Sequence, residues 1–389
     1  MNDIEPNDLA LARDVLGELD SDLRKLGYAG STDIVRLAFL CLQTRRFEKL
    51  VSLVIKGPSG CGKSFALSSA LNFVPSQTYE YFSGMSERAI VYSGLDLEHK
   101  HLVIAEAAGL SGGVGRAFLR QMISEGRIRY MTVQSTEKGV HGKELPPIKG
   151  PCGLIMTTTA NALHPEDESR MLTVNMPESG EQIRRALLAQ ARGRSNQEAV
   201  DFNKWHELDA FIGGEPNAVS IPFAEPLAKA LPVTHFRVQR DFPQVLSLIG
   251  AHALLHKGNR ARNTDNEIVA SLEDYAAVYA LVNGPISQGL ESAVPDNIRL
   301  LVTAVEELAG KAGAYAFETS AVSQRQLAEH LGRDQSVISR NVWKAIDEGY
   351  LANSAQGQGR EAKLVLGERQ LPQGYALPEP ERLREPVEA

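Results

Sequence analysis

The chain has 389 residues, of which 43% are hydrophobic and 23% charged, and its net charge is -7 at pH 7. This length accommodates two or three domains, and the composition excludes a chain that is disordered over most of its length. The negative charge excludes the overall basic footprint common in nucleic-acid binders, so any contact with DNA must come from local basic patches.

Targeting and cross-linking signals are missing from the sequence. The start, MNDIEPNDLA, has no basic segment followed by an apolar one, and no later run approaches the roughly 20 apolar residues that span a bilayer. We therefore expect a soluble, cytoplasmic protein without membrane contact. Cys41, Cys61 and Cys152 are odd in number and widely spaced, which fits neither a disulfide framework nor a zinc site.

The first 50 residues are predicted to be helical. Apolar residues recur at three- and four-residue spacing from Leu9 to Leu26. After a glycine-containing break, Ser31-Thr32-Asp33 is typical of a helix start, and a second helix is predicted to about Phe47. We expect this extension to pack on the domain that follows.

The most specific motif is GPSGCGKS at residues 57–64, after an apolar run and before a predicted helix. It matches G-x-x-x-x-G-K-[ST] at every fixed position, in the strand-loop-helix context that the pattern requires. Glycines let the backbone curl around phosphate oxygens, Lys63 adds positive charge, and the Ser64 hydroxyl can ligate Mg²⁺. The predicted nucleotide-binding residues are Gly57, Pro58, Ser59, Gly60, Cys61, Gly62, Lys63 and Ser64.

The region from Val51 to about Met176 alternates short apolar runs with helical segments. This alternation predicts an α/β domain with a mainly parallel sheet. The expected strands are Val51–Ile55, Ala89–Tyr92, Leu102–Ala105, Leu154–Thr159 and Met171–Val174.

Two classes of phosphate-loop protein are disfavoured. Guanine-specific GTPases carry N-K-x-D after a strand, whereas Asn203-Lys204-Trp205-His206 lacks both the Asp and the strand. A small-molecule kinase needs a site for the phosphate acceptor and a short lid, and no motif for either can be identified in the sequence.

The predicted strand that begins at His101 ends in Glu106. A carboxylate at a strand end beside the phosphate loop can orient the attacking water and help hold Mg²⁺. The usual pattern is Asp-Glu, but Ala105 stands at the first position. Either Glu106 serves both roles, or hydrolysis is weak and the nucleotide acts mainly as a switch. The alternative is a solvated Glu at a strand end.

Two further residues follow the next predicted strand. Asn161 is placed where a polar group could sense the γ-phosphate. Arg170 lies on the loop that leads to the last strand, the point from which a ring-forming motor supplies an arginine finger to a neighbouring subunit's site. Taken alone, an Arg in this position is more often a solvated loop residue.

Together these motifs resemble the AAA+ ATPases, and within them the minichromosome-maintenance (MCM)-like motors encoded by mobile elements and prophages. The resemblance covers roughly Leu50–Lys257 and the C-terminal domain. It implies a P-loop NTPase fold that uses ATP and Mg²⁺. The implied roles are Lys63 and Ser64 for phosphate and metal, Glu106 as catalytic carboxylate and second metal residue, Asn161 as first sensor and Arg170 as finger.

The segment His235–Phe242 is similar to the second-sensor lid of these motors. The resemblance implies a nucleotide contact from this segment, and we choose Arg240 for it, with Arg237 as the alternate. A basic helix start that packs against an acidic neighbour is an equally good explanation of either residue alone.

An insertion at residues 125–150 is predicted to form a β-hairpin. Ile128–Gln134 reads as a strand and Ser135–Lys143 as its exposed turn, with a returning strand from Glu144 that is limited by Pro146-Pro147. In MCM-like motors a hairpin at this point projects into the ring channel and contacts the DNA backbone. A ring multiplies a small basic excess, so an acidic subunit can still present a basic channel. A plain surface hairpin is the alternative. The DNA-binding candidates are Lys138, His141 and Lys143.

A helix-turn-helix pattern near the C-terminus gives an independent signal. Ser323–His330 and Gln335–Glu348 are the two helices. Gly349-Tyr350-Leu351 begins a β-wing that Ala362–Leu366 closes, so the segment resembles a winged helix of the MarR-like kind. Winged helices also bind proteins, and the local charge is nearly neutral, so that alternative stays open. The residues that could touch DNA are Gln335, Ser336, Ser339, Arg340 and Lys344.

These features predict the organisation of the whole chain. The segments are a helical extension at 1–50, an AAA+ core at 51–230 with the hairpin at 125–150, a helical lid at 231–290, a linker helix at 291–310, a winged-helix domain at 311–370 and a disordered tail at 371–389.

The predicted function is that of a ring-forming, ATP-dependent DNA translocase, a helicase-like ATPase in the replication of a mobile element or prophage. The expected ring is a hexamer and the expected track is single-stranded or forked DNA. Only about 50 residues precede the core, so a primase or other replication partner is expected to supply loading or strand separation. The alternatives are a nucleotide-switched DNA-binding regulator that uses its winged helix, and a loader or remodeller that acts on a protein.

Overall fold

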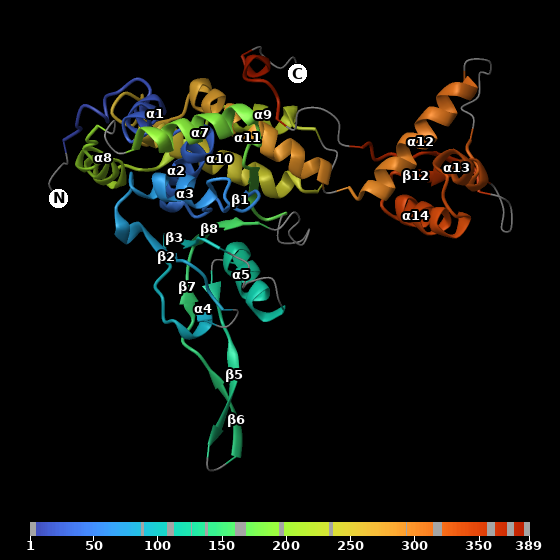
Figure 1. The fold of residues 1–389 in the computed structure, drawn as a ribbon, viewed down its shortest axis with the longest axis horizontal. Coiled ribbons are helices and arrows are strands. Elements are labelled where there is room, and N and C mark those ends of the chain that lie inside the picture. The colour runs from blue at the N-terminus through green and yellow to red at the C-terminus, as the bar shows by residue number, and fades with distance from the viewer. Residues whose placement is uncertain are drawn as a thin grey trace. The chain divides into compact units, whose positions relative to one another are not determined.

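The chain forms two compact units (Figure 1). The first comprises residues 1–231, 239–286 and 377–389, and the second comprises residues 232–238 and 287–376. The computed structural model describes residues 5–86, 89–106, 113–125, 127–136, 139–159, 169–193, 198–232, 236–292, 294–313, 321–355, 362–371 and 377–384.

The core of the first unit is a five-stranded sheet in the order β2-β3-β8-β1-β9. All four neighbouring pairs are parallel, so the predicted α/β fold with a parallel sheet is confirmed. Every residue of β1 and β8 is buried, as expected of central parallel strands that are covered on both faces. The strands are β1 Leu53–Lys56, β2 Tyr79–Phe82, β3 Lys100–Ile104, β8 Cys152–Thr158 and β9 Leu172–Asn175.

One predicted strand is wrong and one strand was not predicted. Ala89–Tyr92 forms the short helix α4, because a four-residue apolar run fits a buried helical turn as well as a strand. The sheet instead contains β2 at Tyr79–Phe82, an edge strand that pairs only with β3 and is only partly buried. A half-exposed strand of this kind lacks the continuous apolar run that marks the others.

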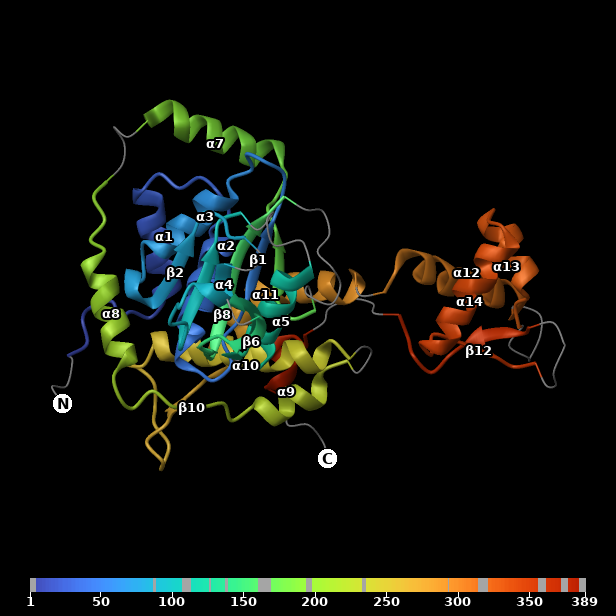
Figure 2. The same cartoon turned by 90° about the horizontal axis from the view of Figure 1, so that it is seen from below.

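Helices surround this sheet in the first unit. Helix α7 has no buried residue and lies along the outer margin of the unit (Figure 2). The short parallel pair is β10 Val219–Ser220 with β11 Ile268–Val269. The helices are α1 Val15–Lys25, α2 Thr32–Gln43, η1 Thr44–Arg46, α3 Lys63–Leu71, η2 Ser76–Thr78, α5 Gly113–Glu125, α7 Gly180–Arg192, α8 Asn203–Gly213, α9 Ala224–Ala230, α10 Val238–Leu255 and α11 Leu272–Ser292.

The N-terminal helices pack on this unit through aromatic and polar contacts. Trp205 of α8 is 1% exposed and meets the ring of Phe39 of α2 edge-on at 5.6 Å. Its indole N–H donates to the Asp22 carboxylate of α1 (2.9 Å). A buried indole N–H needs such an acceptor, so this hydrogen bond fixes α1 against α8.

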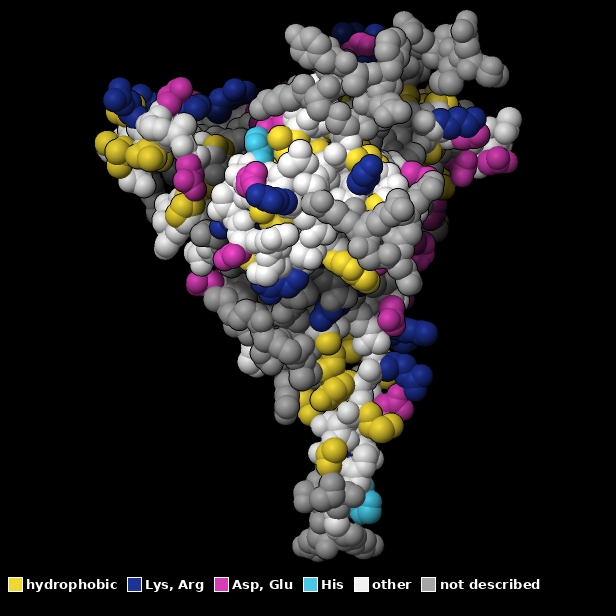
Figure 3. Space-filling model, turned by 90° about the vertical axis from the view of Figure 1, so that its right-hand side faces the viewer, with side chains coloured by type: hydrophobic (Ala, Val, Ile, Leu, Met, Phe, Trp, Pro, Cys, Tyr) yellow, Lys and Arg dark blue, Asp and Glu magenta, His cyan; other side chains and the backbone are white. Residues whose placement is uncertain are grey.

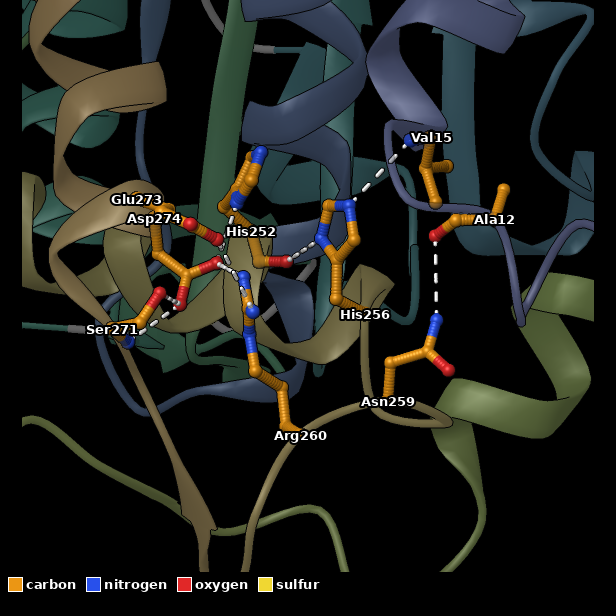
Figure 4. Close-up of polar contacts among 9 residues, drawn as sticks. All are labelled: Ala12, Val15, His252, His256, Asn259, Arg260, Ser271, Glu273 and Asp274. Carbon is orange, nitrogen blue, oxygen red and sulfur yellow. Dashed lines mark hydrogen bonds and ion pairs between the residues drawn. The ribbon is translucent and has the colours of Figure 1, made fainter.

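A buried polar cluster joins α10 to α11 and to the start of α1 (Figure 4). His252 Nδ1–H donates to Asp274 Oδ1 (2.7 Å), and the Arg260 guanidinium donates to the same oxygen (2.5 Å). Burial raises the pKa of the Asp274 carboxyl, but these hydrogen bonds and the charges of the donors outweigh it and hold the pKa below its usual value. His256 accepts from the backbone N–H of Val15 (3.5 Å) through Nε2 and donates to the His252 carbonyl (3.0 Å). The Asp274 carboxylate and both ring nitrogens of His256 already have hydrogen-bond partners in the protein, so their geometry favours a structural role over metal binding.

His101 of β3 is a buried neutral histidine beside the start of β1. Its Nε2–H donates to the Val51 backbone oxygen (3.1 Å). Burial lowers the pKa of the imidazole from 6.5 to about 3. Between these two values the unfolded chain binds a proton that the folded chain does not, so the free energy of unfolding falls as the pH falls.

Replacing His101 with Gln should remove this pH dependence, because an amide can still donate to Val51 but does not titrate. Between pH 7 and pH 5 the wild type should lose about 2 kcal/mol more stability than the variant. Urea unfolding of both proteins at the two pH values measures the difference. Equal losses would show that the imidazole is not the titrating group.

The insertion between α5 and β8 forms the predicted hairpin, which projects from the sheet (Figure 1). Its root is the antiparallel pair β4 Arg127–Ile128 with β7 Ile148–Lys149, and its arm is β5 Met131–Thr136 with β6 Gly139–Glu144. The returning strand therefore begins at Gly139 and not at Glu144, which shortens the predicted turn.

The described residues of the second unit after α11 form helices and an antiparallel hairpin. They are α12 Asp296–Gly313, α13 Gln324–Leu331 and α14 Gln335–Asp347, with β12 Leu351–Asn353 paired to β13 Leu364–Leu366. Ile298 and Leu301 of α12 share one core with Leu327 of α13 and Val342 of α14. Helix α12 thus belongs to this unit and is not a free-standing linker at 291–310.

The chain end differs from the predicted disordered tail. Residues 380–383 form the 3-10 helix η5. The Leu377 N–H donates to Asn283 Oδ1 (3.1 Å), and the Tyr275 hydroxyl donates to the Pro378 carbonyl (2.6 Å). Leu377 is 4% exposed, so a buried side chain and two hydrogen bonds order a segment whose composition alone suggests disorder.

None of the helices within the described ranges combines the length and hydrophobicity that a membrane span requires.

Candidate functional site

The predicted phosphate loop joins the carboxyl end of β1 to the first turn of α3. Gly57, Gly60 and Gly62 have φ values of 157°, 81° and 93°, a region that favours glycine. The Lys63 ammonium donates to the carbonyls of Gly57 (2.8 Å) and Pro58 (2.6 Å). The loop therefore curls around the lysine side chain at the start of a helix, where backbone N–H groups and the helix dipole favour an anion.

Close packing leaves no room for a side chain at Gly57. A Cβ there would lie 2.8 Å from Cys61 Sγ and 3.0 Å from Met176 Cβ. The Gly57 N–H donates to the Thr158 carbonyl at the end of β8 (3.3 Å). The first residue of the loop is thus held by β8 and by the residue that follows β9, which fixes the loop at the carboxyl edge of the sheet.

Glu106 lies at the same edge, two residues beyond the end of β3. Its side chain is exposed, while the preceding carbonyl of Ala105 accepts a hydrogen bond from the Thr157 hydroxyl of β8. Strand β8 separates β3 from β1, so roughly 10 Å, or two strand spacings, divides the two strand ends. Ser64 is also exposed at this edge. A hydroxyl and a carboxylate are oxygen ligands of the kind that Mg²⁺ prefers, so these residues fit the predicted metal.

Arg170 lies at the opposite, amino edge of the sheet. It precedes β9, whose first residue Leu172 pairs with Leu53, while its last residue Asn175 pairs with Lys56 beside the loop. Four strand residues of about 3.3 Å each therefore separate Arg170 from its own phosphate loop. Its Nε donates to Ser124 Oγ at the end of α5 (2.9 Å).

Lys49 is a basic neighbour of Arg170 that the sequence did not reveal. Burial lowers the pKa of its ammonium, and the charge of Arg170 adds to the effect. Its Nζ donates to the Ile123 carbonyl (3.5 Å). No motif marks this lysine, because its position depends on how α5 packs beside the start of β1.

The two candidates for the second sensor lie in different surroundings. Arg240 of α10 is exposed and donates to Ser169 Oγ (2.6 Å), which places it beside Arg170 and not beside its own phosphate loop. Arg237 is 4% exposed and donates to the Gly289 carbonyl (3.2 Å) inside the second unit. Arg240 therefore lies beside the segment that carries Arg170 in this structure, and its contact with a nucleotide stays a prediction. Asn161, the predicted first sensor, falls outside the described residues.

The hairpin arm has two chemically different faces. Met131 and Val133 are 69% and 68% exposed on one face of β5, whereas the partners of Thr132 and Gln134 across the arm are Lys143 and His141. Figure 3 shows Lys and Arg side chains, interspersed with Asp or Glu, along one flank of the hairpin and mainly hydrophobic side chains along the other. Both Lys143 and His141 are exposed, but they lie on the returning strand and not in the turn. Lys138 lies outside the described residues.

The predicted DNA-binding helix of the second unit is α14. Gln335, Ser336, Arg340 and Lys344 are exposed, whereas Ser339 is half-buried. Lys344 forms an ion pair with Glu348 (3.8 Å). Trp343 is 74% exposed on the same helix; its large side chain, between two basic positions, was visible in the sequence but belongs to no motif.

Comparison with known proteins identifies no family. No protein-family model matches the chain, and no curated protein sequence matches it. A solved structure named "SCCmec type IV Cch - active helicase" is similar with a TM-score of 0.39 and 13% sequence identity, over 94% of this chain and 71% of that one. Similarity at this level is too weak to carry a conclusion about fold or function.

Proposed function

We propose that this chain is an ATP-driven DNA translocase of the AAA+ type, a helicase-like motor that works as a ring, with six subunits as the expected number. The observation that carries the proposal is the position of two predicted site residues. Lys63 lies at the carboxyl edge of the sheet and Arg170 at the amino edge. One subunit cannot bring both to one phosphate. A head-to-tail ring joins two different surfaces of neighbouring subunits, and the proposed ring would set the amino edge of each subunit against the carboxyl edge of the next.

The chemistry would be hydrolysis of ATP to ADP and phosphate. A water oxygen attacks the γ-phosphorus, the bond to the β-phosphate oxygen breaks, and Glu106 accepts a proton from the water. Lys63 and the loop N–H groups hold the β- and γ-phosphates. Ser64 and Glu106 would hold Mg²⁺, which supplies neutralising charge when bound.

Arg170 and Arg240 would act together on the nucleotide of the neighbouring subunit. The hydrogen bond from Arg240 to Ser169 (2.6 Å) places both guanidinium groups near the same edge. Charge delivered from a neighbour stabilises the transition state only in the assembled ring, so hydrolysis depends on assembly.

The β5–β6 hairpin would be the surface that contacts the DNA track. In the second unit, α13, α14 and the β12–β13 hairpin would form a winged helix.

Replacing His141 and Lys143 together with Ala should lower the affinity for single-stranded DNA about tenfold and remove most of the DNA stimulation of ATP hydrolysis. The rate without DNA should not change. Lys229→Ala is the control, since Lys229 is exposed and paired with Glu225. An unchanged DNA response in the double variant would exclude the hairpin as the track.

The experiment that tests the proposed function is the ATPase rate per subunit against protein concentration, with and without single-stranded DNA. We expect the rate to rise as the ring assembles and to rise further with DNA. A rate that depends on neither contradicts the motor.

A second candidate, a loader or remodeller that acts on a protein, is favoured by the surface of α14. Trp343 is 74% exposed, and tryptophan is enriched at protein interaction hot spots. The ion pairs Lys344–Glu348 and Arg325–Glu329 reduce the basic character of this unit. An Arg340→Ala variant that binds DNA as tightly as the wild type would favour this candidate.

A further inference from the structure

A cavity of about 520 Å³ lies at the amino edge of the sheet, beside the root of the hairpin. It is lined by the chain segment that leads into β1, by the end of α5, by the first residue of β4, and by the chain from the last residue of β7 to the first residue of β8. Its charged lining residues are Glu48, Lys49, Glu125, Arg127 and Lys149.

Arg127 and Lys149 stand directly opposite each other across β4 and β7. Their neighbours Ile128 and Ile148 are 1% and 4% exposed in the core, so strand alternation turns both basic side chains to the outer face. Like charges directly opposite in an antiparallel pair are destabilising. Among the residues that the structure describes, neither cation has an ion-pair partner.

More positive charge borders the same cavity. Lys49 lines it, and Arg170 contacts its lining residue Ser124 (2.9 Å). Two carboxylates, Glu48 and Glu125, also line it, so the basic residues around the cavity outnumber the acidic ones. A cluster with this excess, built on an unfavourable pair of like charges, is stabilised by an anion that lies between the cations.

We infer that this cavity, which we term the root cavity, binds a backbone phosphate of single-stranded DNA between Arg127 and Lys149. The inference rests on the proposed function, because the root strands β4 and β7 lead into the arm β5–β6 that is proposed as the track. The volume accommodates a phosphate with its sugar. A strand that follows the hairpin toward the sheet would reach this cavity at the end of the arm.

The test compares the wild type with the double variant Arg127→Gln/Lys149→Gln. Binding of a fluorescein-labelled oligothymidine is measured by anisotropy from about 50 to 200 mM salt. If the pair neutralises the charge of one phosphate, the slope of log affinity against log salt should fall by about 0.7, and the affinity at low salt should fall about tenfold. The charge-matched control is Arg185→Gln/Lys229→Gln, two exposed side chains that form ion pairs with Glu181 and Glu225.

Two further readouts separate the possible causes. Without DNA the double variant should melt at the same temperature as the wild type or higher, because a repulsion has been removed; a clearly lower melting temperature would overturn the inference. If the double variant binds DNA with the same affinity and the same salt slope as the wild type, the proposed phosphate site in the root cavity is wrong, but the proposed function still stands. If the double variant binds DNA normally but hydrolyses ATP more slowly without DNA, the cavity would belong to the nucleotide site of a neighbouring subunit. This result would also overturn the inferred DNA site. A wild type that binds no DNA would overturn the proposed function as well.

Discussion

Replacing Glu106 with Gln should lower the turnover number for ATP hydrolysis by about 10²–10⁴-fold, the usual contribution of a general base. Glutamine has nearly the same shape but cannot accept the proton of the attacking water. Nucleotide affinity should change little, because the loop from Gly57 to Ser64 and its lysine remain intact. A steady-state ATPase assay and a fluorescent-nucleotide titration measure the two quantities.

Glu98→Gln is the matched control for this prediction. Glu98 precedes β3, at the other end of the strand that Glu106 follows, and its side chain is exposed. Loss of the same charge there should leave the rate unchanged. Normal hydrolysis by Glu106→Gln would place the catalytic carboxylate elsewhere. Ala105 stands where these motors usually have Asp, which left open that hydrolysis is weak and that the nucleotide acts mainly as a switch. A low ATPase rate of the wild type would support that interpretation.

Replacing Arg170 with Ala should lower the ATPase rate of the assembled protein by about 10³-fold or more, the usual contribution of an arginine finger. Arg170 lies at the amino edge of the sheet, away from the phosphate loop of the same subunit, so that subunit should bind its nucleotide normally. The rate at high protein concentration should therefore fall while the nucleotide dissociation constant stays the same. Arg170→Lys should recover only part of the rate, since an ammonium keeps the charge but not the planar fork.

A structural role of Arg170 must be distinguished from a catalytic one, because its Nε also contacts Ser124. The melting temperature and the size of the assembled particle measure the structural role. Arg185→Ala removes an exposed arginine from α7 and should change neither rate nor assembly. Full activity of Arg170→Ala in an intact assembly would remove the arginine from the proposed site.

The phosphate loop and the parallel sheet follow from local patterns. The loop needs glycines and a lysine at fixed spacing between a buried strand and a helix, and β1 and α3 form where that spacing predicts. Ala89–Tyr92 was predicted as a strand and forms the helix α4, because a short run such as AIVY carries no period that separates the two states, whereas no prediction was made for the strand β2. The residues of β2 form a strand because they pair with β3 in the folded sheet.

Residues brought together across the fold could not be predicted in the same way. The contact of Arg240 with Ser169 depends on how α10 packs, and Lys49 carries no motif at all. The opposition of Arg127 and Lys149 depends on the register of the hairpin root, which the sequence leaves open around Pro146 and Pro147. Asn161 and Lys138 lie outside the described residues and stay predictions.

The central claim is that the active site is shared between two subunits, and mixing two inactive variants tests it most directly. Lys63→Ala removes the phosphate-binding lysine and keeps the arginine, whereas Arg170→Ala does the opposite. Each protein alone should be nearly inactive. In a randomly mixed ring, about a quarter of the interfaces combine an intact loop with an intact arginine, so an equal mixture should recover about a quarter of the wild-type ATPase rate. A mixture as inactive as its components, although the two proteins assemble together, would contradict the shared site.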